Sequence, residues 1–321
     1  MHNHKFNISF TGNRKIYFTI SAVLIAVSIL STFVFGAKLD IQFKGGTIIT
    51  YIYDGDIDES NFEKTAEDAL GGLDVNITTG KDFSTGKNNI QVSLVSNSGL
   101  TSDKQYELTS ALEEKFSANS IKIVESSDIS PTSGKEFFQK CLVAVAFSSL
   151  LLVIYIAIRF KNIGGWLAGA CAIVALIHDC IIVYGTFVVC HMSINANFIA
   201  VVLTILGYSI NDTIITYDRI RENQQLFKKT KSRSEIVNLS INQTLTRSIN
   251  TSITTVTAMI VVTIVAIIFG VDSIISFSLP MVFGMISGVY SSVCIASPLW
   301  DALETIKDKK AAAKPKSGKK I

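Results

Sequence analysis

The chain has 321 residues, of which 48% are hydrophobic and 17% charged, and its formal net charge is +3. This composition is too apolar for an ordinary soluble domain of the same length and predicts a membrane protein. The five cysteines lie in or at the ends of apolar stretches and include no CxxC pair, so we interpret them as packing residues rather than as metal or redox ligands.

Six stretches are apolar and long enough, at roughly 20 residues each, to cross a hydrocarbon core about 30 Å thick. They cover about 16–36, 139–158, 166–190, 196–217, 251–269 and 273–297. The first is longer than the apolar segment of a typical signal peptide, so we interpret it as an uncleaved anchor. The predicted fold class is therefore a polytopic α-helical membrane protein with six transmembrane helices.

Lysine and arginine residues are distributed unevenly between the loops. They gather in the N-terminus, in 159–165, in 219–247 and in the tail, whereas 191–195 and 270–272 contain none. Because the four basic segments fall on one side of six spans, the positive-inside rule predicts that both termini are cytoplasmic. The predicted organisation is a cytoplasmic N-terminus (1–15), helix 1 (16–36), an extracytoplasmic domain (37–136), a five-helix region (137–299) and a basic cytoplasmic tail (300–321).

The extracytoplasmic segment is acidic, with nine Lys/Arg against seventeen Asp/Glu residues, a net charge of −8. Strand-like runs such as GTIITYIY (46–53) and helix-like runs such as DESNFEKTAEDALGG (58–72) follow one another in the order β-α-β-β-α-β. This order predicts a small α+β domain of the ferredoxin-like type between helices 1 and 2. The acid excess is typical of a solvated face; a surface for basic or unfolded segments is the alternative.

Polar side chains recur in three of the spans. The third span holds His178 and Asp179 near its middle. In the fourth span, spacings of three and four predict one shared helical face, formed by Thr204, Tyr208, Asn211, Asp212 and Thr216. In the fifth span a second stripe leads in from the basic end, formed by Arg247, Asn250, Thr251 and Thr254. Such faces are expected to point into the bundle or a wet cavity, because polar groups facing lipid are costly.

The two buried carboxyl groups suggest a chemical role. If Asp179 or Asp212 is purely structural, its buried carboxylate needs a partner. Alternatively, burial disfavours the charged form of the carboxylate, which allows the group to exchange protons near neutral pH. His178 is equally compatible with a neutral packing residue, and Arg247 with a cation that reaches the interface. The adjacent His178 and Asp179 point about 100° apart on a helix, and no HExxH motif occurs, so we predict neither a metal site nor an enzyme. The pattern indicates a proton-coupled membrane device.

The sixth span contains two glycines at GxxxG spacing, Gly284 and Gly288, which permit a close approach between helices. Pro280 lies one turn earlier and is expected to kink the helix. The glycines fit equally well with packing inside this subunit and with contact to a partner.

Four strings resemble signatures of the SecF proteins in the SecD/SecF family of protein-export membrane proteins. They are GYSINDTIITYDRIREN (207–223), which opens with Gly207, INQTLTRSINTSITT (241–255), ALIHD (175–179) and FKGGT (43–47). The resemblance covers nearly the whole chain, because the six spans and the single domain after span one also agree. Many relatives have Asp directly before the Phe of FxGGT, where this chain has Gln42, with Asp40 two residues earlier. Gly45 and Gly46 of this motif are expected to form a tight turn.

The resemblance implies a multi-pass subunit of the Sec export machinery in the bacterial inner membrane, with a fold similar to resistance-nodulation-division transporters. The implied partners are SecD, the SecYEG channel, the translocating unfolded polypeptide and membrane lipid, with no nucleic acid. The implied energy source is the proton gradient, with no cofactor. Asp212 then aligns with the family's proton-relay aspartate, Asn211 is its hydrogen-bonding neighbour, and Arg247 aligns with the arginine at the start of span five. His178 and Asp179 match a further family motif, for which both a functional and a structural role are open.

The alternative is a self-contained proton-coupled exporter of lipids or small molecules. Such an exporter would also use acids inside the membrane. Six spans are only half of the usual twelve, and the external domain is small, so we favour the export subunit.

Overall fold

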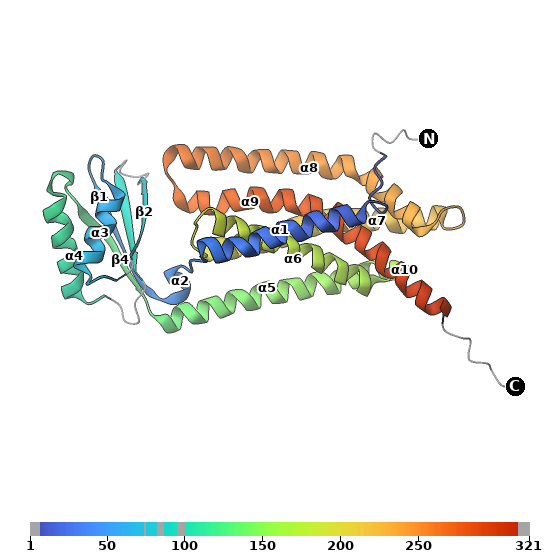
Figure 1. Ribbon diagram of the computed structural model, residues 1–321, viewed down its shortest axis with the longest axis horizontal. Coiled ribbons are helices and arrows are strands. Elements are labelled where there is room, and N and C mark those ends of the chain that lie inside the picture. Colours follow the sequence, from blue (N-terminus) through green and yellow to red (C-terminus); the bar gives the residue numbers. More distant parts are fainter. Residues whose placement is uncertain (1–6, 74, 82–86, 95–99, 314–321) are drawn as a thin grey trace.

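The structure is a computed structural model that describes residues 7–73, 75–81, 87–94 and 100–313. A long helical bundle occupies one end of the molecule and a small sheet domain the other (Figure 1). The long helices are α1 (Arg14–Phe35), α5 (Pro131–Arg159), α6 (Gly165–Val189), α7 (Ala196–Phe227), α8 (Arg233–Phe269) and α9 (Asp272–Ser291), and α9 continues through a π-helical turn (Ser292–Ala296) into α10 (Ser297–Ala313). Six helical segments are long and apolar enough to cross a membrane, which confirms the predicted six spans.

Two of these helices extend well beyond the apolar stretches that predict them. α7 continues ten residues past 217, and α8 begins at Arg233 although its apolar stretch begins at 251. The polar part of α8 begins with a capping box, in which Ser232 and Glu235 satisfy each other's backbone N–H groups. Hydropathy detects only the part of a helix that lipid can surround, so the polar extensions were not predicted.

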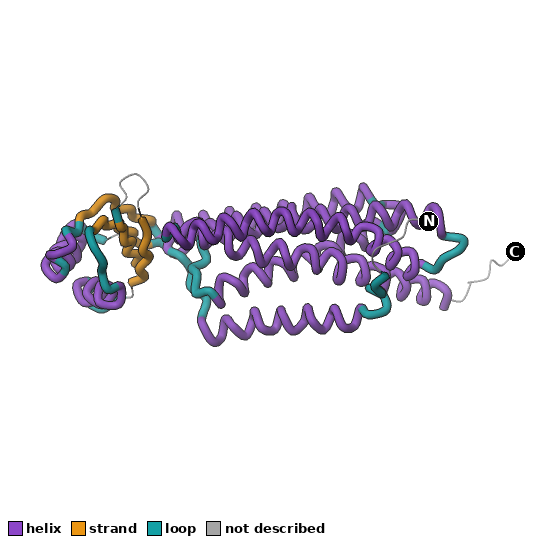
Figure 2. The backbone as a smooth tube through the Cα atoms, turned by 90° about the horizontal axis from the view of Figure 1, so that it is seen from above, coloured by secondary structure: helices purple, strands orange, loops and turns teal. Residues whose placement is uncertain are grey.

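The sheet domain has one hydrophobic core. Its elements in chain order are β1 (Gly46–Tyr53), α3 (Glu59–Ala69), β2 (Val75–Lys81), β3 (Asn88–Leu94), α4 (Ser102–Lys115) and β4 (Lys122–Ile129). The strands form one antiparallel sheet in the order β2-β3-β1-β4. Alternate residues of β1, such as Ile49 and Tyr51, are buried against Phe62 of α3 and Leu108 of α4. Figure 2, like Figure 1, shows the strands between these helices and the bundle.

A tight joint connects the sheet domain to the bundle. The short helix α2 (Ile41–Lys44) leads into Gly45 and Gly46, whose φ angles are +83° and +151°. A Cβ atom on Gly45 would lie 2.5 Å from the Cα of Pro131, the first residue of α5, so both the φ angle and the space require glycine there. Gln42 accepts a hydrogen bond from the N–H of Ala196 at the start of α7 (3.0 Å). Both entry and exit of the domain are thus fixed to the bundle.

Candidate functional site

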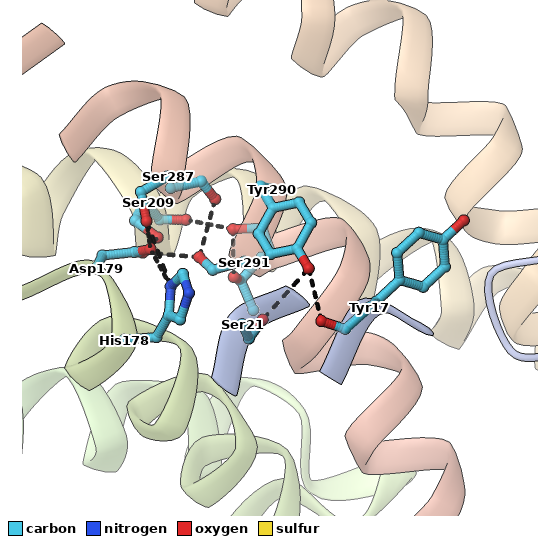
Figure 3. Close-up of polar contacts among 11 residues, drawn as sticks. Tyr17, Ser21, His178, Asp179, Ser209, Ser287, Tyr290 and Ser291 are labelled. Atoms are coloured by element: carbon cyan, nitrogen blue, oxygen red, sulfur yellow. Dashed lines mark hydrogen bonds and ion pairs between the residues drawn. The ribbon is translucent and has the colours of Figure 1, made fainter. Parts of the chain in front are cut away.

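The carboxyl group of Asp179 lies at the centre of the bundle, in the middle of α6, with 0% of its surface exposed. Its Oδ2 accepts hydrogen bonds from Ser209 of α7 and Ser291 of α9, both at 2.7 Å. Its Oδ1 accepts from Ser287 of α9 at 2.5 Å and lies 3.2 Å from Nδ1 of His178. Figure 3 shows these side chains converging on one point from three helices. We call Asp179, His178, Ser209, Ser287 and Ser291 the Asp179 cluster.

His178 closes one side of this cluster. Its Nδ1 lies 3.3 Å from the Ser287 hydroxyl, and its Nε2 is buried with no hydrogen-bond partner among the described residues. The imidazole ring lies 6.0 Å from the ring of Tyr290, whose hydroxyl donates to the backbone carbonyl of Tyr17 in α1 (2.7 Å, Figure 3). The sequence predicted divergent His178 and Asp179 side chains; the structure brings them into contact. No group of three or more His, Cys, Asp or Glu side chains in the described ranges could hold a metal ion.

Asp212 of α7 has a different environment from Asp179. It is 3% exposed, and a single side-chain hydrogen bond reaches its carboxyl group, from Ser248 of α8 (3.2 Å). Thr216 donates to the backbone carbonyl of Asp212, not to its carboxyl group. Asp212 therefore keeps acceptor sites that no described donor occupies, whereas both oxygens of Asp179 are used.

Arg247 lies beside Asp212 without contacting it. The residue is exposed, and its guanidinium group makes no ion pair or hydrogen bond with a described residue. It lines a groove of about 480 Å³ whose other walls include Asp218, Arg219 and Gln243. The hydrogen bond to Asp212 thus comes from Ser248, which follows Arg247 in sequence. Arg247 itself remains exposed at the surface.

The predicted polar stripe of α7 does not share one environment. Asp212 and Thr216 are buried, Tyr208 is half-buried and bonded to Ser252 and Thr255, and Thr204 and Asn211 are exposed. Spacings of three and four differ from the 3.6-residue turn, so such a stripe drifts around the helix over several turns. On α8 all four residues of the predicted stripe are exposed, namely Arg247, Asn250, Thr251 and Thr254.

The sixth-span glycines face the inside of this chain. A Cβ atom on Gly284 would lie 2.8 Å from side-chain atoms of Ile205 in α7 and Val183 in α6. A Cβ atom on Gly288 would lie 3.0 Å from the Cβ of Ser209. Gly207 of α7 differs, since no described atom lies within 4 Å of its Cβ position.

The serines that complete both sites were absent from the sequence-based prediction. Serine is common in membrane helices and usually bonds to its own helix, as Ser240 does to the carbonyl of Ile236. The available signal was spacing: Ser209 precedes Asp212 by three residues, and Ser287 and Ser291 are four apart on one face.

Comparisons with known proteins identify relatives over almost the whole chain. A family model described as "Protein export membrane protein SecD/SecF, C-terminal" matches residues 108–306. The chain is 31% identical to protein translocase subunit SecF of Sebaldella termitidis over 96% of this chain and 94% of that protein. It is 34% identical to protein translocase subunit SecDF of Bacillus subtilis over 95% of this chain and 39% of that protein.

The fold is similar to a solved structure from the same group. The crystal structure of SecDF, a translocon-associated membrane protein from Thermus thermophilus, matches with a TM-score of 0.77 and 29% identity, over 95% of this chain and 40% of that chain. The chain therefore spans about two fifths of the SecDF proteins and nearly all of the SecF protein that it matches.

Proposed function

The chain belongs to the SecD/SecF family of protein-export membrane proteins, and from this membership we propose that it works with SecD at the SecYEG channel, using the proton gradient to promote translocation and release of emerging polypeptides. The family membership and the six apolar helices make it a multi-pass bacterial membrane protein of the translocation machinery. The coupling to protons, the contact with SecD and the channel, and the exported polypeptide are the proposed parts.

The observation that carries this proposal is an exposed polar face on α7 and α8, at the point where the apolar stretch of α8 meets its polar part. Asn211, Asn250 and Arg247 are exposed and make no side-chain hydrogen bond or ion pair with a described residue. The Asp212–Ser248 hydrogen bond brings the segments carrying them side by side. Amides and a guanidinium without described partners are costly where they meet lipid, which favours cover by a second membrane subunit. We propose that SecD is the subunit that covers this face. In the longer SecDF relatives the region matching this chain is part of a larger protein, which is consistent with that partner.

Asp212 is the proposed proton carrier at that interface. Its carboxyl group is buried, next in sequence to the exposed Asn211. Among the described residues it receives one side-chain hydrogen bond, so acceptor sites remain on the carboxyl group for a proton. Arg247, on the neighbouring helix, supplies a positive charge that can stabilise the deprotonated form. The groove beside Arg247 gives water a route towards this region.

The orientation and the class of the external domain belong to the same proposal. The start of α1 and the end of α10 lie at the end of the bundle opposite the sheet domain (Figure 1), which supports two cytoplasmic termini and an extracytoplasmic domain. The strand order β2-β3-β1-β4, with α3 and α4 packed on one face, supports a ferredoxin-like class for that domain.

The test is export of a model precursor with and without a proton gradient, in cells that express Asp212→Asn together with SecD. We expect this variant to insert and assemble but to lose gradient-dependent export, because Asn keeps the size and hydrogen bonding and cannot titrate. The control is Asp308→Asn in α10, which removes an exposed acid that is paired with Arg233 and does not line the groove. Normal gradient dependence in Asp212→Asn would show that Asp212 is a structural acid.

A further inference from the structure

We propose that Asp179 is a positioning residue: it fixes α7 against α9 and thereby sets the position of Asp212, and it does not carry protons itself. This inference rests on the proposed role of Asp212 and assigns a separate task to the other acid in the bundle.

The first argument is the number and origin of the donors. Three hydroxyl groups and one imidazole nitrogen surround the Asp179 carboxyl group, two on each oxygen. The hydroxyl groups come from α7 and α9, and Asp179 itself belongs to α6, so one side chain joins three helices. A carboxylate whose acceptor sites are filled by fixed donors suits an anchor, whereas a carrier must bind and release a proton in each cycle.

The second argument is that the same contact is reinforced along α7, on both sides of Asp212. Ser292, the first residue of the π-helical turn after α9, donates to the backbone carbonyl of Ser209 (3.0 Å), and Thr213 donates to the Ser292 hydroxyl (2.9 Å). Gly288 lets the two helices approach at Ser209. Ser209 and Thr213 flank Asp212 in sequence, so the turn of α7 that carries the proposed carrier is held from one side by Ser292.

The π-helical turn at Ser292–Ala296 belongs to this arrangement. It begins at the serine that bonds to both Ser209 and Thr213. A π-helical turn changes the angular spacing of side chains within a helix, and such turns are frequent at functional sites. The π-helical turn directly follows Ser291, the last serine that bonds to the carboxyl group of Asp179. Its first residue, Ser292, bonds to the α7 backbone instead.

The third argument is separation of the two acids. The Asp212 carboxyl group bonds to Ser248 of α8, and within the described ranges no side-chain hydrogen bond joins this pair to the Asp179 cluster. On its other side the cluster ends at His178 Nε2, which has no described partner. Tyr290, whose ring lies 6.0 Å from the imidazole, has its hydroxyl bonded to Tyr17 and Ser21 of α1 instead. Asp179 therefore acts on Asp212 through the position of α7 and not through a proton path.

The experiment measures the protonation of Asp212 directly, in the complex of the full chain with SecD. A hydrophobic carbodiimide reacts with protonated carboxyl groups in membranes, and peptide mass spectrometry gives the labelled fraction of Asp212 at each pH. Three variants weaken the anchor: Asp179→Asn, Ser209→Ala and Ser291→Ala. The matched control is Ser278→Ala, a buried serine of α9 outside the cluster.

We expect all three anchor variants to displace the midpoint of Asp212 labelling in the same direction, by about half a pH unit or more, and Ser278→Ala to leave it unchanged. Asp179→Asn should keep gradient-dependent export at a reduced rate. Two results would overturn the inference: unchanged midpoints in Ser209→Ala and Ser291→Ala, or loss of gradient dependence in Asp179→Asn as complete as in Asp212→Asn. If Asp179→Asn does not assemble, the two serine variants still decide. Because labelling does not depend on export, this test can fail or succeed independently of the proposed function.

Discussion

Replacing Gly284 with alanine is expected to destabilise the isolated subunit, because the new methyl group has no room. Its Cβ would lie 2.8 Å from atoms of Ile205 and Val183, and both of these side chains are fully buried. Overpacking of a core costs about 1–3 kcal/mol, and the higher helix propensity of alanine returns at most about 1 kcal/mol. The free energy of unfolding should therefore fall, by up to about 2 kcal/mol once the full propensity gain is subtracted.

The matched control is Gly207→Ala, the same change in a neighbouring helix. No described atom lies within 4 Å of the new methyl group, so the isolated subunit should keep its stability or gain slightly. The measurement is thermal unfolding of each purified subunit in one detergent, followed by the yield of the complex with SecD. Gly207 lies on the exposed side of α7, so a larger residue there, Gly207→Leu, should lower the yield of the complex and leave the unfolding temperature of the subunit unchanged.

The reasoning would be refuted by the opposite pattern. An unchanged unfolding temperature for Gly284→Ala, combined with loss of the complex, would mean that Gly284 contacts the partner and not α6 and α7. Equal destabilisation by Gly284→Ala and Gly207→Ala would mean that the cost comes from the backbone and not from the contacts at Gly284.

Two further predictions concern the sheet domain. A soluble 40–134 fragment should unfold cooperatively on heating, because β1, α3 and α4 enclose a complete core; a broad, non-cooperative melt would contradict this. Burial raises the pKa of Tyr51 to about 12, so between pH 10 and 12 the unfolded chain ionises first and the free energy of unfolding falls. Tyr51→Phe should reduce that fall by up to about 1.4 kcal/mol per pH unit, measured by denaturant titration, and identical slopes would refute the assignment.

The overall architecture was predictable because its determinants are local. A stretch of roughly 20 apolar residues defines a span whatever surrounds it, and alternating patterns indicate the strands of the small sheet. The polar parts of α7 and α8 were missed for the same reason: hydropathy does not register a helix outside the membrane. Their start is nevertheless visible at Ser232 and Glu235, which have the spacing of a capping box.

The candidate site was predictable only in its charged members. Asp179 and Asp212 stand out because an acid inside a span is rare. What distinguishes them is the neighbouring helix: α9 brings two serines to Asp179, whereas α8 brings one to Asp212. A serine in an apolar helix gives no indication of which acceptor it faces, because that depends on helix rotation and crossing. The division of the polar stripe of α7 into buried and exposed residues also depends on helix rotation and crossing, so the sequence did not predict it.

The close contact between Gly45 and Pro131 couples the orientation of α5 to that of the sheet domain. Ser130 links β4 directly to α5, and Gly134 packs against Gly45 so closely that its Cβ position lies 3.0 Å from the Gly45 nitrogen. The 29 residues of α5 extend roughly 43 Å from this joint to the opposite end of the bundle. A rotation of the sheet domain about the joint is thus also a tilt of α5, and a tilt of about 10° displaces its far end by roughly 7 Å. One continuous helix, α5, therefore connects the sheet domain to the opposite end of the bundle.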